Sequence, residues 1–243
     1  MQINSFHLKI IACLAMLVDH IGYIFFPKVL IFRVIGRLAF PIFAFLITQG
    51  YTHTKNLQDY LFRLFVFLMI SEPFYLFAFR PVSIECINIF GTLFLGLVAI
   101  YLYEIISNKT YAWTAVVMLS LFGSFLGVDY GFFGILLIFS FYLYDIKKDF
   151  YALFFTQCLL IMIYIGYSYV IYSIILHVSV TIGWFLAQLM YLAVLPLIKY
   201  YNGQKGKIVN KYAFYAFYPV HIAVLSITYV CLTRWQSTIL ATL

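Results

Sequence analysis

Five titratable side chains interrupt stretches of sequence that are otherwise apolar enough to cross a lipid bilayer. They are Asp19, His20, Arg37, Glu72 and His221. A charge at mid-depth in hydrocarbon costs at least roughly 2.5–3.5 kcal/mol on insertion scales, so it needs a partner and usually marks a working site. Imidazoles and carboxylates are also the groups that most often move protons in enzymes. We therefore take these five residues as the candidate catalytic residues.

The composition places the chain among integral membrane proteins. Hydrophobic residues make up 65% of the sequence and charged residues only 9%, and the mean hydropathy is +1.02. A soluble domain has about 25% charged residues, so this chain has too few to cover a surface that faces water. No stretch is polar enough to form a separate soluble module, so we expect one membrane domain over residues 1–243.

Polar and turn-forming residues divide the chain into about nine apolar segments. Each is near the roughly 20 residues that a transmembrane helix needs, and only helices can satisfy their own backbone in lipid. The predicted spans lie near 8–26, 29–50, 61–79, 89–107, 111–128, 131–146, 150–172, 176–199 and 211–232. The apolar run over 166–178 leaves one boundary open, so eight to ten spans fit. The predicted fold is thus all-α, a polytopic transmembrane helical bundle.

Basic residues are unevenly distributed between the two sets of loops. The loops after the even-numbered spans hold nine of them, against three elsewhere (Lys28, Arg80 and Arg234). The nine are Lys55, Arg63, Lys109, Lys147, Lys148, Lys199, Lys205, Lys207 and Lys211. Because loops rich in Lys and Arg stay in the cytoplasm, the N-terminus is predicted to be cytoplasmic. Topology and contact with anionic lipid explain the net charge of +7, so nucleic-acid binding is not needed.

The candidate catalytic residues are predicted to lie at one depth. With a rise of 1.5 Å per residue, each is roughly 12–16 Å inside its span, which predicts a shared mid-membrane cavity. Asp19 and His20 are adjacent, so their side chains diverge by about 100° around the helix. We expect Asp19 to pair with Arg37, and His20 to face Glu72 or His221. Pro73 is expected to kink its helix and open space beside Glu72.

Several sequence blocks resemble the TraX family over nearly the whole chain. The blocks are MLVDHIGYIFFP, RVIGRLAFPIFAFLITQGYTHTKN, YLFRLFVFLMISEPF, DYGFFGILLI, LPLIKYYNGQKGK and KYAFYAFYPVH, in the family's order. One departure is Gln204-Lys205, which stands where the family pattern has an Arg after Asn-Gly. The resemblance implies an inner-membrane protein that acetylates the amino terminus of a conjugative pilin. It also implies acetyl-CoA as the donor.

Acetyl-CoA is anionic and cytoplasmic, so a site for it needs cations on the cytoplasmic side. The candidate cofactor-binding residues are His53, Arg63, Asn202, Lys205, Lys207 and Lys211. An Asn202-Gly203 turn would aim backbone donors at the phosphates. The sequence contains no zinc-binding, nucleotide-loop or Cys/His motif, so no metal is expected.

In this interpretation His20 is the general base on the acceptor amine or hydroxyl. Arg37 or Glu72 fixes the site and stabilises charge on the carbonyl. Direct transfer and a transient acyl-imidazole both fit the sequence. The acceptor is a membrane-inserted pilin or other peptide, or a surface glycan.

Structural roles and two other classes of function fit the same residues. An Asp19–Arg37 pair also serves as a clamp between the first two spans, and His221 is suited to bind a carbonyl freed by Pro219. An ion-coupled transporter also uses mid-membrane ionisable residues. A non-catalytic membrane assembly factor would use them only to hold helices together.

Overall fold

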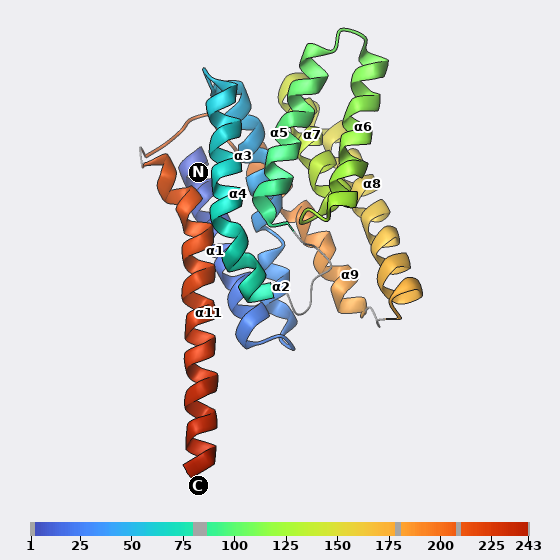
Figure 1. Cartoon of the computed structure of the whole chain (residues 1–243). Helices are drawn as coiled ribbons and strands as arrows, with labels where there is room; N and C mark the ends of the chain where they lie inside the picture. The colour runs from blue at the N-terminus through green and yellow to red at the C-terminus, as the bar shows by residue number, and fades with distance from the viewer. Residues whose placement is uncertain (1–2, 80–86, 178–180, 208–209, 243) are drawn as a thin grey trace.

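The computed structural model describes residues 3–79, 87–177, 181–207 and 210–242. It is built from eleven α-helices, one π-helical segment and one 3₁₀ segment (Figure 1). In chain order these are α1 (Ser5–Phe25), α2 (Leu30–Gly36), α3 (Ala39–His53), α4 (Leu57–Phe79), α5 (Ile89–Ile105), α6 (Lys109–Leu126), α7 (Gly131–Lys147), α8 (Phe150–Tyr169), η1 (Val170–Ile175), α9 (Ile182–Leu189), η2 (Met190–Val194), α10 (Leu195–Lys199) and α11 (Lys211–Thr242). The only β-type pairings among the described residues are two isolated bridges, Ile3 with Tyr201 and Ile87 with Val128.

These segments make nine rods, in the order that the sequence predicts. α2 and α3 form one rod with a turn at 37–38, η1 continues α8, and η2 joins α9 to α10. Six rods are long and apolar enough to cross a membrane. They are Ser5–Phe25, Leu30–His53, Leu57–Phe79, Phe150–Ile175, Ile182–Lys199 and Tyr212–Arg234, and Ile89–Ile105 is a shorter apolar helix. The predicted all-α, polytopic membrane fold is therefore confirmed.

Helices α5, α6 and α7 are short, with 17, 18 and 17 residues. In Figure 1 their lower ends lie well above the lower ends of α1 and α11. The connection between α6 and α7 therefore lies inside the height of the bundle. Polar groups at this level must find partners within the protein, because lipid offers none.

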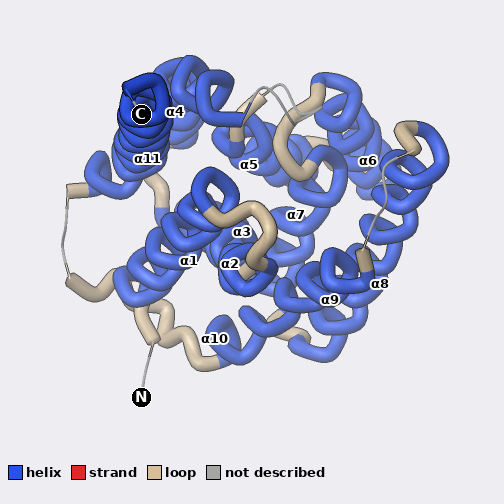
Figure 2. The backbone as a smooth tube through the Cα atoms, turned by 90° about the horizontal axis from the view of Figure 1, so that it is seen from below, coloured by secondary structure: helices blue, strands red, loops and turns tan. Residues whose placement is uncertain are grey.

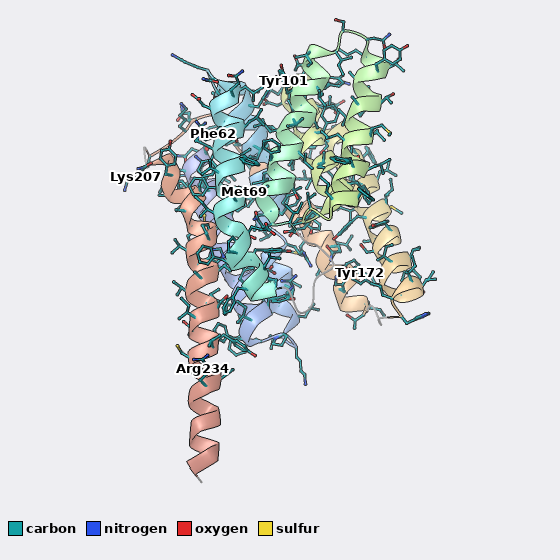
Figure 3. All side chains as sticks on the ribbon, viewed as in Figure 1. Phe62, Met69, Tyr101, Tyr172, Lys207 and Arg234 are labelled. Carbon is teal, nitrogen blue, oxygen red and sulfur yellow. The ribbon has the colours of Figure 1, made fainter. Side chains whose placement is uncertain are left out.

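The rod made of α2 and α3 lies at the centre of the bundle, and the other helices surround it (Figure 2). Half of its most apolar window is buried, the largest share among the six rods that are long enough to span a membrane. Ile42 and Ala44 of α3 are fully buried, and so are Phe133 and Ile135 of α7. Large apolar side chains on the periphery, such as Phe62 and Met69 of α4, point away from the bundle (Figure 3). This arrangement suits a protein whose outer surface faces lipid.

The connections that carry most of the basic residues lie on one side of the bundle. Those after α3, α5, α7 and α10 share a side with the N-terminus in Figure 1. We call this side the basic face, and its residues include Lys55, Lys109, Lys148 and Lys205. The predicted grouping of the basic loops is therefore confirmed, whereas their cytoplasmic location stays a prediction. Arg80, counted on the opposite side, lies outside the described residues.

A close approach of α1 and α2 depends on Gly36. A Cβ atom at Gly36 would overlap the carboxylate of Asp19 in α1. The hydrogen at this position lets the two helices pack with the carboxylate against the α2 backbone.

We expect Gly36→Ala to destabilise the protein by about 1–3 kcal/mol, because a methyl group at this contact forces the helices apart. Gly166→Ala in α8 is the matched control, since a Cβ there meets nothing within 4 Å. Thermal unfolding in detergent measures both variants. Equal unfolding temperatures for the two would contradict this account of the α1–α2 contact.

Candidate functional site

A cavity of about 420 Å³ opens at the basic face. Its walls come from α1, α3, α4, α5, α11 and the segment that precedes α11. Four cationic side chains and one histidine line it: Lys9, Arg63, Lys205, Lys207 and His53. Figure 3 shows Lys207 at the basic face, near the start of α11. Four of the predicted cofactor-binding residues therefore share one cavity.

The interior of this cavity is apolar and largely aromatic. Leu64, Leu93, Phe90, Tyr215 and Tyr218 are among its lining residues. Phe90 and Tyr215 stack with centroids 6.1 Å apart, and Phe90 meets Tyr218 edge to face at 5.6 Å. The cavity thus combines cations with an aromatic interior, which suits a ligand with an anionic end and a less polar end.

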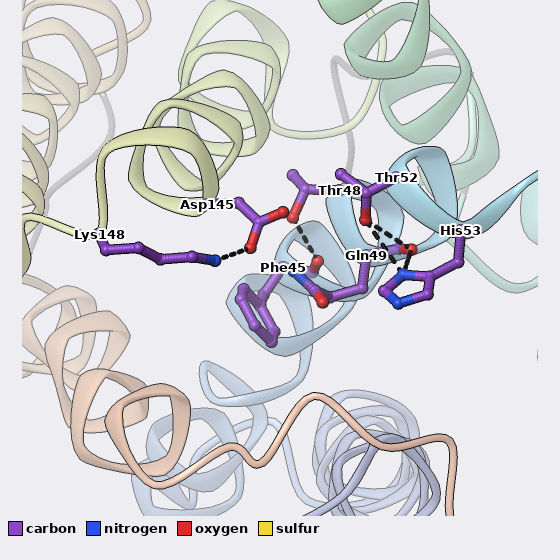
Figure 4. A network of polar contacts seen from close by, with 7 residues as sticks. All are labelled: Phe45, Thr48, Gln49, Thr52, His53, Asp145 and Lys148. Carbon is purple, nitrogen blue, oxygen red and sulfur yellow. Dashed lines mark hydrogen bonds and ion pairs between the residues drawn. The ribbon is translucent and has the colours of Figure 1, made fainter.

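His53 is held at the end of α3 by two contacts (Figure 4). Its Nδ1 donates to the backbone oxygen of Gln49 at 2.8 Å, and lies 3.1 Å from Oγ1 of Thr52. These contacts occupy Nδ1. The ring therefore presents Nε2 as its remaining polar atom, and His53 lines the cavity.

The segment before α11 is attached to the start of α1. Asn202 N donates to Ile3 O at 2.9 Å, Ser5 N to Gln204 O at 2.9 Å, and Phe6 N to Lys205 O at 3.1 Å. Asn202 Oδ1 accepts from Gln204 N at 3.0 Å. These bonds fix the backbone that carries Lys205 at the mouth of the cavity.

The predicted turn at Asn202-Gly203 is present, with a φ of +75° at Gly203. Gly203 lines the cavity but Asn202 does not, because its side chain is used within the turn. Lys211 is the first residue of α11, and the structure does not describe its side chain.

His20 and His221 form a hydrogen-bonded pair inside the bundle. His20 Nδ1 lies 2.7 Å from His221 Nε2, and the two rings are nearly parallel at 6°. His221 Nδ1 in turn lies 2.6 Å from the backbone oxygen of Phe217. His221 is buried and His20 is largely covered. The pair joins α1 to α11.

The hydrogen-bond acceptors in the series from His20 through His221 to Phe217 O determine which ring nitrogens carry hydrogen. A carbonyl oxygen only accepts, so His221 Nδ1 carries a hydrogen and its Nε2 is the acceptor when the ring is neutral. His20 Nδ1 therefore donates to His221 Nε2. In a neutral His20 ring, Nε2 then has a free lone pair and can accept a proton. This tautomer leaves His20 Nε2 as an acceptor, and the role of His20 as a base stays a prediction.

His221 binds a different carbonyl from the one the sequence suggests. Pro219 lacks the N–H that would bind the carbonyl of Tyr215, four residues earlier. The imidazole instead binds Phe217 O, four residues before its own position, and stacks on the Phe217 ring with centroids 4.7 Å apart. His221 is thereby locked to its own helix, and its Nε2 points to α1.

Asp19 pairs with Arg33 and not with the predicted Arg37. Arg33 Nη1 donates to Asp19 Oδ2 at 2.7 Å. Arg33 and Arg37 are one turn apart, and Arg37 keeps helical dihedral angles. The Arg37 guanidinium lies against Tyr191, whereas Arg33 reaches Asp19. The Asp19 carboxylate lies over Gly36. The predicted clamp between the first two rods exists, with a different arginine.

Arg37 instead enters the aromatic centre of the bundle. It is buried, and its Nη1 lies 3.5 Å from the hydroxyl of Tyr191. Tyr191 itself is fully buried. The packing around Tyr191 therefore keeps this guanidinium away from the cavity at the basic face.

Glu72 binds the start of α5 and not a histidine. Its Oε2 accepts from Asn88 Nδ2 at 2.6 Å and from Asn88 N at 3.1 Å. Asn88 Nδ2 also donates to Leu68 O at 3.0 Å, and Asn88 Oδ1 caps α5 by accepting from Phe90 N at 3.0 Å. Glu72 and Asn88 thus join α4 to α5, which is a structural role.

The prediction that all five candidate catalytic residues share one cavity is wrong. None of the five is among the residues that line the cavity at the basic face. Divergent helix faces send them to three neighbours: α2 for Asp19, α11 for His20 and α5 for Glu72. The link between cavity and histidines is Tyr218, which lines the cavity and whose ring centroid lies 6.1 Å from His20 and 5.8 Å from His221.

Three residues of this region escaped the sequence analysis. Arg33 precedes Arg37 by four residues on an apolar segment, so the spacing alone placed two arginines within reach of Asp19. Lys9 lies near the start of α1 and lines the cavity. Tyr218 is one of 22 tyrosines, and no sequence signal separates it from the others.

Comparison with known proteins gives two curated relatives. The chain is 30% identical over 239 residues to the "Probable fimbrial assembly protein FimC, serogroup H1" of Dichelobacter nodosus, covering 91% of this chain and 94% of that protein. It is 31% identical over 97 residues to an uncharacterised protein of Rickettsia prowazekii, covering 40% of this chain and 36% of that one. No solved structure matches the chain.

The fold and the buried polar contacts define a multi-pass helical membrane protein with a cation-lined cavity on one side. The model of the TraX protein family matches residues 5–229. The chain therefore belongs to the TraX family.

The histidine pair is expected to contribute measurably to stability. Removing either imidazole leaves the other with an unpaired polar atom inside the bundle. We expect His20→Ala and His221→Ala to be non-additive, with a coupling free energy of about 1 kcal/mol or more in a double-mutant cycle.

The control cycle combines His20→Ala with His177→Asn. His177 is exposed, and asparagine tolerates its positive φ of 55°. We expect the control cycle to be additive. Additivity in both cycles would show that the two imidazoles do not interact.

Proposed function

We propose that this protein is an acetyltransferase of the cytoplasmic membrane. It moves the acetyl group of cytoplasmic acetyl-CoA to an amine or hydroxyl acceptor. The acceptor is a pilin-like or other peptide N-terminus presented in the membrane, or a surface glycan. One observation carries the proposal. A cation-lined cavity at the basic face is bordered by Tyr218, and the ring of Tyr218 contacts a histidine pair in which His20 Nε2 can accept a proton.

The charge and the aromatic lining of the cavity support acetyl-CoA as the donor. The phosphates of acetyl-CoA carry several negative charges, and Lys9, Arg63, Lys205 and Lys207 surround the cavity. Its volume of about 420 Å³ lies in the range of small-molecule sites, about 300–1,000 Å³. The pantetheine arm is narrow and less polar than the phosphates, which suits the aromatic interior. The thioester then points toward Tyr218 and the histidines.

His20 is suited to act as the base. The acceptor nitrogen or oxygen attacks the thioester carbonyl while His20 Nε2 takes its proton. The new C–N or C–O bond forms, the C–S bond breaks, and the CoA thiolate takes the proton back from His20. Positive charge on His20 is spread through His221 to Phe217 O, along the two hydrogen bonds at 2.7 and 2.6 Å. The Asp19–Arg33 pair positions α1 so that His20 faces α11.

Direct transfer and transfer through an acyl-imidazole differ in what His20 Nε2 does. In direct transfer Nε2 only takes a proton, whereas an acyl-imidazole would need Nε2 to bind the acetyl carbon. Trapping with labelled acetyl-CoA without acceptor separates them, because only the second route labels the protein.

The relatives support an acceptor connected with pili. The Dichelobacter nodosus relative is described as a probable fimbrial assembly protein, and it aligns over 94% of its length. A membrane-embedded enzyme would reach the N-terminus of a pilin subunit that is inserted in the membrane. A role in pilus assembly or modification follows for this chain.

We expect His20→Ala to abolish acetyl transfer from labelled acetyl-CoA to a peptide with a free N-terminal amine. Loss of a general base lowers the rate by about 10²–10⁴-fold. His177→Asn, which changes an exposed histidine outside the site, is expected to keep wild-type activity. Equal transfer by wild type and His20→Ala would remove His20 from the mechanism.

We expect Arg63→Ala and Lys205→Ala to weaken CoA binding by about tenfold each at low salt, because each removes a charge-assisted contact to phosphate. The matched control is Lys55→Ala, an exposed cation on the same face that does not line the cavity. Isothermal titration with CoA in detergent measures the three variants. Identical affinities for Lys55→Ala and Arg63→Ala would mean that the face, and not the cavity, attracts CoA.

A further inference from the structure

Tyr218 lies at the boundary between the cavity and the histidine pair. It is 4% exposed and belongs to α11, three residues before His221. Its ring is part of the cavity wall, and it meets His20 edge to face at 6.1 Å and His221 at 5.8 Å. Tyr218 therefore contacts the cavity and both imidazoles.

Packing holds the Tyr218 ring in place. The ring of Phe90 meets it edge to face at 5.6 Å, and its hydroxyl interacts with the backbone of Ile89 at the start of α5. Asn88 and Glu72 fix that end of α5. A side chain that is packed on several sides moves little when a larger group is placed beside it, because displacing packed side chains costs free energy.

A second aromatic ring contacts His20 without touching the cavity. The Phe79 ring, at the end of α4, lies 5.1 Å from the His20 ring, and Phe79 is 6% exposed. Phe79 is not among the residues that line the cavity. Tyr218 and Phe79 are thus similar neighbours of His20, and only Tyr218 borders the space where the donor would bind.

We propose that Tyr218 is the residue that sets the length of the acyl group that the protein transfers. In this proposal the ring limits how far an acyl group extends from the cavity toward His20, so that an acetyl group is accepted and longer acyl chains are excluded. The inference rests on the proposed acetyl transfer and adds the specificity of its donor site. Tyr218 is the lining residue whose ring also contacts both imidazoles, so we assign the limit on acyl length to this ring.

The expected preference for acetyl-CoA follows from the effect of one methylene group on kcat/KM in a closely packed site. An enzyme separates substrates that differ by one methylene by about 10–200-fold. Wild-type protein should therefore prefer acetyl-CoA to butyryl-CoA by at least about tenfold in kcat/KM. Removing the phenol ring removes the obstacle, so that preference should fall by at least about tenfold.

The test compares four variants with wild type in detergent: Tyr218→Leu, Tyr218→Met, Tyr218→Phe and Phe79→Leu. Each receives acetyl-CoA or butyryl-CoA with one peptide acceptor that has a free N-terminal amine. Isothermal titration measures the affinity of both acyl-CoA molecules without turnover. Tyr218→Met retains an unbranched apolar side chain and replaces the leucine variant if that variant does not fold.

The expected result is a loss of acetyl preference in Tyr218→Leu and Tyr218→Met, in kcat/KM and in affinity. Tyr218→Phe keeps the ring and should keep the preference. Phe79→Leu changes the rate through its contact with His20 but should leave the acetyl-to-butyryl ratio unchanged.

Three results would overturn the inference: a wild type that uses both donors equally, a leucine or methionine variant with the wild-type ratio, or Phe79→Leu with the same shift as Tyr218→Leu. A wild type that transfers neither acyl group would instead contradict the proposed function. In that case the ratio of the two affinities still tests Tyr218, because a ring that limits length also discriminates in binding.

Discussion

An imidazole inside a membrane protein needs a polar partner, and the bond between His20 and His221 provides one for each ring. The two residues are 201 positions apart in sequence, and their 2.7 Å contact joins α1 to α11 within the bundle. Phe217 O orients His221, and His221 orients His20. The same contact thus closes the bundle and leaves Nε2 of His20 as the atom with a free lone pair. The proposed chemistry depends on this direction of hydrogen bonding.

The other buried polar groups hold helices in the positions that the histidine pair requires. Asp19 and Arg33 fix α1 against α2, and Gly36 provides the space for that carboxylate. Glu72 and Asn88 fix α4 against α5 and thereby support the wall of the cavity. Replacing one partner of such a buried contact leaves the other unpaired, which is costly in a low-dielectric interior. Asp19, Arg33 and Glu72 therefore hold helices together, whereas the proposed function assigns proton transfer to His20.

The sequence predicts the fold well, because apolar run length and basic loop residues have direct physical causes in a bilayer. The nine rods and the grouping of the basic connections on one side follow from these signals alone. The divergence of Asp19 and His20 was also predictable from their adjacency. The partners were not predictable, since Arg33 and Arg37 are one turn apart and only the packing of the bundle places Arg37 against Tyr191. Glu72 binds Asn88, the residue that caps α5. Tyr218 was not predictable either, because its role depends on which ring lies between a cavity and an imidazole.

The most direct measurement is the proton position in the histidine pair, read from ¹⁵N chemical shifts of the full-length protein labelled at histidine. Single substitutions of His20 and His221 assign the two rings. The account predicts that both rings carry hydrogen on Nδ1 at neutral pH, that His20 Nε2 is unprotonated, and that a coupling connects His20 Nδ1 with His221 Nε2. A His20 ring with hydrogen on Nε2, or no coupling between the rings, would contradict it.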